Sequence, residues 1–272
     1  MIKDFTLGQY FPGNSVLHRL DPRMKIVLVT AYIILLFFAQ SALSYLLAAG
    51  VTFALMLLSG IPLKLYVRGL KPIVFIVIFT GIINMFYTSG NILCSWWIFQ
   101  ITDLGIANAV RMILRIMLLV WASSMLTYTT SPVVLTNGLE SLLSPLKVFH
   151  IPVHEFSMMV SLALRLIPTL IEETNRIMSA QKARGADFET GGLIRRMKAI
   201  IPIIVPLFIS SFRRADELAT AMQCRCYNGD SKNRTRLVCY SLHVRDYMSV
   251  VFMAAFFAGI ILLNFITLFG VA

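Results

Sequence analysis

Three long stretches of the chain, residues 26–63, 72–102 and 247–272, contain no Asp, Glu, Lys or Arg. A helix needs about 20 apolar residues to cross the hydrocarbon core of a bilayer. Within that core, only helices and closed barrels satisfy their own backbone polar groups. The stretches lack the alternation of barrel strands, so we interpret them as helices. The pattern therefore predicts an all-α, polytopic membrane protein.

Turn and breaker residues divide these stretches into separate helices. The first stretch is long enough for two helices with a turn near Gln40 and Ser41, and Pro62 breaks the second helix. Trp96 and Trp97 are typical of a membrane interface and follow the third helix. We expect five transmembrane helices: four in the N-terminal region 1–130, at about 24–39, 42–60, 70–88 and 104–128, and a last one within 246–272.

Residues 131–245 form a polar interval that is too long for a connection without structure of its own. Apolar positions spaced by three, four and seven predict a long amphipathic helix over 153–184, which Gly185 ends. A second apolar-to-polar stretch predicts another long helix over about 193–225. Three prolines inside these helices are expected to bend them: Pro168, Pro202 and Pro206.

The distribution of basic residues sets the expected topology. Fifteen of the 24 Lys and Arg residues lie in 131–245, while the segments 40–41, 89–103 and 267–272 contain none. Because basic residues accumulate on the cytoplasmic side, we expect a cytoplasmic N-terminus, a cytoplasmic helical domain over 131–245 and an outside C-terminus. Arg111 and Arg115 fall inside the fourth helix, where we expect them to face a partner subunit or to lie in the interface.

Composition and short motifs narrow the chemistry. The chain is 58% hydrophobic and 14% charged, with a net charge of +11. In a basic soluble protein, this charge would suggest nucleic-acid binding. Here the positive-inside pattern of membrane proteins explains the charge. We therefore expect membrane lipid as a partner and no binding to nucleic acid. The sequence has no P-loop and no H-E-x-x-H. Its four cysteines lack zinc-type spacing, so no metal, cofactor or catalytic set is expected.

Each of the two long helices is expected to end at one arginine between small residues. The first tip is Ala183, Arg184 and Gly185, and the second is Cys224, Arg225 and Cys226. A guanidinium stays charged and makes geometrically fixed hydrogen bonds, and small neighbours let a partner approach. Both tips are therefore candidate docking sites for another protein. The alternative is that both arginines are solvated cations favoured by the helix C-terminal dipole.

These residues resemble the transmembrane (T) component of energy-coupling factor (ECF) transporters, over nearly the whole chain. The segment from His18 to Lys25 is similar to the family's segment before the first span. Residues 183–185 match the first arginine motif, and residues 214–227, with the Arg-Thr-Arg that ends at Arg236, are similar to the second. One departure is Cys224, where alanine is common, and cysteine is also small.

The resemblance implies a non-catalytic subunit of an ATP-driven importer. Two ABC ATPase subunits would dock at the two tips and hydrolyse ATP, and Arg184 and Arg225 would each enter a groove on one of them. One substrate-binding S component would pack on the membrane helices and the two long helices, which thereby act as coupling helices. Movement of these helices would reorient the S component and release a vitamin or trace metal inside. From the sequence itself, we add the hypothesis that the three prolines act as bends that let the tips move.

Two other classes of protein remain as alternatives. A stand-alone secondary transporter or channel would need polar residues along a path through the membrane, and Asn84, Arg111 and Arg115 are the main candidates. A membrane enzyme such as a lipid-modifying transferase would need a convergent acid/base or metal-binding set, and the sequence offers none.

Overall fold

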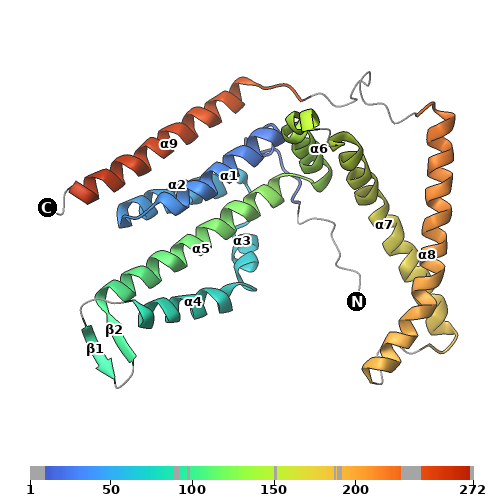
Figure 1. Cartoon of the computed structure of the whole chain (residues 1–272), viewed down its shortest axis with the longest axis horizontal. Coiled ribbons are helices and arrows are strands. Elements are labelled where there is room, and N and C mark those ends of the chain that lie inside the picture. Colours follow the sequence, from blue (N-terminus) through green and yellow to red (C-terminus); the bar gives the residue numbers. More distant parts are fainter. Residues whose placement is uncertain are drawn as a thin grey trace. The chain divides into compact units, whose positions relative to one another are not determined.

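The computed structural model describes residues 10–88, 92–96, 99–149, 152–186, 188, 192–227 and 240–269. These residues form nine α-helices, one 3₁₀ helix and one two-stranded hairpin (Figure 1). The chain divides into two compact units. The membrane unit comprises Gly8–Leu139 and Tyr240–Ala272, and the helix-pair unit comprises Met1–Leu7 and Glu140–Cys239. The expected all-α polytopic class is confirmed, with the hairpin as an unpredicted addition.

The membrane unit is built from long apolar helices. Its helices are α1 (Pro22–Phe38), α2 (Ala42–Ser59), α3 (Leu63–Leu70), α4 (Val74–Tyr87), α5 (Asp103–Thr129) and α9 (Val244–Phe269). Among the described residues, α2, α5, α7 (Val153–Ala183) and α9 are long and apolar enough to cross a membrane, and α3 with α4 adds a fifth if the bent pair is one span. The expected span over 24–39 corresponds to α1, which has only 17 residues.

The third expected span, 70–88, differs in detail from the structure. Helix α3 ends at Leu70, and α4 begins at Val74 after a bend of 60°. Pro72 lies in the bend and explains it, because proline lacks a backbone N–H and its ring clashes with the preceding turn. The expectation that the helix begins at residue 70 is therefore wrong by four residues.

Buried side chains from four helices form the main core of the membrane unit. Large fully buried members include Leu36 of α1, Tyr45 of α2, Leu118 of α5 and Ile260 of α9. Helix α4 packs along α5 (Figure 1). This apolar core fixes the helix ends that carry the polar residues described below.

A short antiparallel hairpin connects α4 to α5. Strand β1 (Ile92–Trp96) pairs with β2 (Phe99–Thr102), with Trp96 opposite Phe99 and an irregularity near Cys94. From the sequence, an interfacial segment without strands was expected here. Trp97, one of its two interfacial tryptophans, lies outside the described residues.

The helix-pair unit is dominated by α7 and α8 (Leu193–Cys224), which pack against each other. Before them, α6 (Pro132–Leu143) begins at Pro132 and is followed by the 3₁₀ helix η1 (Ser144–Phe149). The predicted long helices at 153–184 and 193–225 are confirmed to within one residue. Both continue without a break through their prolines. The Arg-Thr-Arg segment that ends at Arg236 lies outside the described residues.

Candidate functional site

Two backbone hydrogen bonds close the C-terminal end of α7. Gly185 N–H donates to the Lys182 carbonyl, and Ala186 N–H donates to the Gln181 carbonyl, both at 3.0 Å. This crossed pair is the Schellman motif, which needs a left-handed residue just after the cap. Gly185 supplies it with φ of 85°. Arg184 therefore occupies the C-cap position, where the chain leaves the helix.

Helix α8 ends in the same motif. Cys226 N–H donates to the Gln223 carbonyl at 2.9 Å, and Tyr227 N–H donates to the Met222 carbonyl at 3.0 Å. Here the left-handed position is held by Cys226, with φ of 57°. Arg225 takes the C-cap position, so both arginines occupy equivalent places in one backbone geometry.

Both tips are open to contact from outside the chain. All six tip residues are exposed: Ala183, Arg184, Gly185, Cys224, Arg225 and Cys226. The predicted helix ends are confirmed. The docking role of the tips stays a prediction.

A polar contact joins α7 and α8 between the two tips. Arg214 of α8 donates from Nη1 to Thr169 Oγ1 at 2.8 Å and from Nη2 to Glu173 Oε2 at 3.3 Å. The C-terminal ends of the two helices lie at opposite ends of the pair (Figure 1). Arg184 and Arg225 are thus presented to two different places rather than to one.

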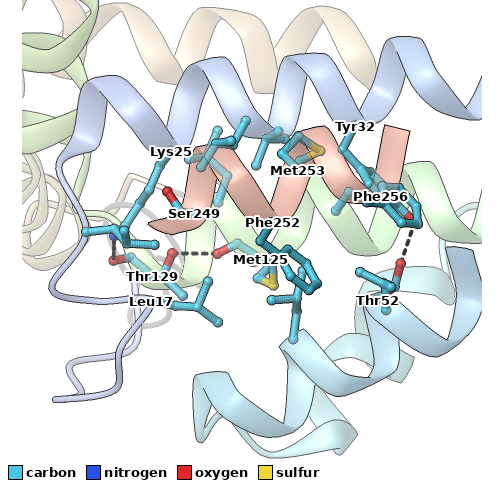
Figure 2. Close-up of a pocket in the computed structure, with 17 residues that line it drawn as sticks. Leu17, Lys25, Tyr32, Thr52, Met125, Thr129, Ser249, Phe252, Met253 and Phe256 are labelled. Carbon is cyan, nitrogen blue, oxygen red and sulfur yellow. Dashed lines mark hydrogen bonds between the residues drawn. The ribbon is translucent and has the colours of Figure 1, made fainter. Parts of the chain in front are cut away.

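The membrane unit contains an apolar cavity of about 110 Å³ between α1, α2, α5 and α9. Lys25 lies at one end of it and the hydrogen-bonded pair Tyr32 and Thr52 lies at the other (Figure 2). Ligand pockets usually measure about 300–1,000 Å³. The cavity is therefore small for a transported solute.

The ammonium group of Lys25 forms hydrogen bonds that join separate parts of the chain. Its Nζ donates to the carbonyls of Thr129 at 3.1 Å and His18 at 3.4 Å, and to Thr130 Oγ1 at 3.1 Å. An ammonium has three N–H donors, so all three have partners. This lysine joins the start of α1 to the end of α5 and offers no free donor to a ligand.

Arg111 and Arg115 point at the C-terminal end of α1. Arg115 donates from Nη2 to the Ala39 carbonyl at 3.3 Å and from Nε to the Tyr45 hydroxyl at 2.9 Å. Arg111 donates from Nη1 to the Gln40 carbonyl at 3.2 Å. Carbonyls at a helix end lack helical partners, and cations there are favourable. The two arginines thus bind the C-terminal end of α1 within this chain. This contact is additional to the two expected alternatives, a partner subunit or the membrane interface.

Several polar residues that organise these sites were not predicted from the sequence. Asn264 of α9 accepts hydrogen bonds from the backbone N–H groups of Gln40 and Ser41, each at 3.3 Å, and from the Ser44 hydroxyl at 2.9 Å. Asn264 and Ser41 lie 223 positions apart in the sequence. No local pattern reports a contact over such a separation, and the same holds for Arg214 with Glu173.

Together, the apolar helices and the two tips define a multi-pass membrane protein with two exposed helix ends, each capped by an arginine. Comparison with known proteins supplies the family. Residues 13–237 match the sequence model of the family described as "Cobalt transport protein" (CbiQ).

Individual relatives agree over nearly their whole length. The chain is 48% identical to the energy-coupling factor transporter transmembrane protein EcfT of Ruminiclostridium cellulolyticum over 266 residues, 98% of this chain and 99% of that protein. It is 50% identical to EcfT of Acidaminococcus fermentans over 237 residues, 87% of this chain and 88% of the relative. The chain belongs to this family, the membrane components of energy-coupling factor transporters.

Proposed function

We propose that this chain couples two ABC ATPase subunits to one substrate-binding S component, in the uptake of a vitamin or trace metal. The observation that carries the proposal is the equivalence of Arg184 and Arg225. Each is an exposed arginine at the C-cap of a long helix, and each is followed by a left-handed residue in a Schellman motif. Two equivalent arginine tips suit two copies of the same kind of partner. Because the tips lie at opposite ends of the α7–α8 pair, two ATPases have room to bind.

The surface of α8 supports a second partner. Ile201, Val205, Phe208 and Phe212 recur at helical spacing and are all exposed, with Phe208 61% and Phe212 57% accessible. An apolar stripe on a helix is stable only when another surface covers it. The S component covers this stripe in the proposed assembly. ATP hydrolysis takes place on the ATPases, and this chain transmits the movement.

The proposed orientation follows the basic residues. The N-terminus and the helix-pair unit lie in the cytoplasm, where the ATPases are, and the C-terminus lies outside. Reporter fusions at the two termini test this orientation: the N-terminal fusion should report the cytoplasm and the C-terminal fusion the exterior.

The docking proposal is tested by Arg184→Ala, Arg225→Ala and the double variant. The controls are Arg176→Ala and Arg213→Ala, which remove exposed arginines from the same two helices away from the tips. Each single tip variant should weaken co-purification of the ATPases by on the order of tenfold, because charge-assisted hydrogen bonds are lost. The double variant should abolish ATP-coupled uptake while the S component still binds substrate.

Two results would overturn the proposal. One is wild-type uptake by the double variant. The other is uptake by the purified chain without any ATPase, which would favour the stand-alone transporter.

A further inference from the structure

At the end of the membrane unit that holds the start of α5, a polar cavity of about 230 Å³ lies among α1, α4 and α5. Its polar lining residues come from three separate parts of the chain: Gln40, Asn84, Asn108, Arg111 and Arg115. An engineered cavity of about 150 Å³ holds a benzene molecule. This cavity therefore has room for a phosphate-sized group.

The two guanidiniums are held in place by hydrogen bonds, and some of their N–H donors have no partner among the described residues. Arg111 donates to the Ala107 and Gln40 carbonyls and to Asn108 Oδ1, the last at 2.6 Å. Arg115 makes two hydrogen bonds and lies over the rings of Phe37 and Tyr45, 5.6 Å and 5.8 Å from their centroids. Two guanidiniums carry ten N–H donors, and only five have partners among the described residues.

The positive charge of the cavity is also unbalanced. Across the part of the chain that the structure describes, neither Arg111 nor Arg115 forms an ion pair with a carboxylate. Lining amides add further donors without negative charge. The arrangement favours an anion with several acceptor oxygens, and phosphate has the geometry that paired guanidiniums bind best.

The depth of the cavity identifies the source of that phosphate. Lys25 binds the Thr129 carbonyl at the other end of α5, and basic residues mark the cytoplasmic boundary. Counting back about 20 residues along α5 crosses the hydrocarbon core and ends near residue 110. Arg111 lies at this boundary, and Arg115 lies one turn deeper with a side chain long enough to reach outward. This is the level of lipid headgroups.

We propose that Arg111 and Arg115 form a binding site for the phosphate of an anionic phospholipid, in the leaflet that contains the start of α5. The guanidiniums hold the lipid phosphate while they cap the end of α1. The lipid thereby ties α1, α4 and α5 together at this side of the membrane. The site does not depend on the docking tips.

The test is native mass spectrometry of the full-length chain in detergent, with phosphatidylglycerol or phosphatidylcholine of the same acyl chains. Both lipids carry a phosphate, but phosphatidylcholine places a cationic choline beside the two guanidiniums. Wild type should therefore retain phosphatidylglycerol at least about tenfold more tightly than phosphatidylcholine. Arg111→Gln with Arg115→Gln should lose this preference. The matched control, Arg176→Gln with Arg213→Gln, removes the same charge elsewhere and should keep it.

Milder variants guard against a loss of folding. Arg111→Gln alone leaves the Arg115 contacts with Ala39 and Tyr45 intact, and should still weaken phosphatidylglycerol retention. Arg111→Lys keeps the charge without the planar fork and should bind between wild type and Arg111→Gln.

Three outcomes would overturn the proposal. Equal retention of the two lipids by wild type would remove the preference for an anionic headgroup. Stabilisation of wild type by millimolar inorganic phosphate but not by phosphatidylglycerol would assign the site to free phosphate. Unchanged lipid binding by the double variant, with loss of a co-purifying subunit, would show that the arginines meet a partner protein.

Discussion

Arg214 on α8 lies 3.3 Å from the Glu173 carboxylate on α7, and the same guanidinium bonds Thr169 at 2.8 Å. Both charged side chains are partly exposed, at 36% and 25%. A pair of this kind contributes about 0.5 kcal/mol to stability. The contact links α8 to α7 at Thr169 and Glu173.

Reversal of this pair should separate coupling from docking. Arg214→Glu should reduce ATP-coupled uptake while the ATPases still co-purify, because like charges would face each other across the contact. Adding Glu173→Arg should restore part of the uptake. Thermal unfolding of both variants in detergent should stay close to wild type. Wild-type uptake by Arg214→Glu alone would contradict the role of this contact.

The left-handed positions of the two tips should respond in opposite directions to substitution. Gly185→Ala forces a Cβ into a backbone conformation with φ of 85° and should cost about 1 kcal/mol in that turn. Cys226→Gly removes the corresponding cost from the other tip. We therefore expect ATPase affinity to fall about fivefold for Gly185→Ala and to hold or rise for Cys226→Gly.

A variant that keeps the backbone cost checks this explanation. Cys226→Ala removes the thiol but retains a Cβ at the left-handed position, so its ATPase affinity should equal that of wild type. If Cys226→Ala behaves like Cys226→Gly, the thiol rather than the backbone governs the tip.

Close packing of α4 on α5 makes Gly105 sensitive to substitution. A Cβ at Gly105 would lie 2.6 Å from the Met85 carbonyl oxygen and 2.7 Å from Thr102 Oγ1. Relief requires movement of backbone, so Gly105→Ala should cost about 1–3 kcal/mol. The matched control is Gly50→Ala in α2, where a Cβ meets nothing within 4 Å. That change should stabilise the helix by about 0.5–1 kcal/mol. Melting temperatures in detergent measure both, and equal shifts would contradict the packing argument.

Replacement of the helix prolines tests whether these helices must bend. Pro168 immediately precedes Thr169, where Arg214 contacts α7, and Pro202 and Pro206 lie within α8. Alanine restores the missing backbone N–H and stiffens each helix. The triple variant should dock ATPases normally but transport more slowly. Intact transport would reject the idea that these prolines act as bends.

Local sequence signals predicted the two long helices well. Gly185 fixes the end of α7 because only a left-handed residue fits there, and the predicted and observed ends differ by one residue. The end of α8 is equally well placed although Cys226 is a poor left-handed residue. In both helices the sequence changes from apolar to polar along the helix, and this polar part continues as far as the arginine tip.

The remaining differences arise where distant parts of the chain meet. Nothing near Arg111 or Arg115 in sequence reports that the end of α1, about 70 positions earlier, supplies their acceptors. The uncharged run 72–102 begins at Pro72 itself, and the bend there was missed because the expected helix was begun before this proline. The pairing of Ile92–Trp96 with Phe99–Thr102 lacked a turn dipeptide of the usual hairpin type, so the strands were not predicted.

The contact between Thr169 and Arg214 also sets unequal lever arms. About fifteen residues separate Thr169 from Arg184, and about eleven separate Arg214 from Arg225, so at about 1.5 Å per residue the arms measure about 22 Å and 16 Å. With a fulcrum at that contact, equal displacements of the two helix ends would rotate α8 through a larger angle than α7. Two identical ATPase subunits would therefore rotate the two helices by unequal angles.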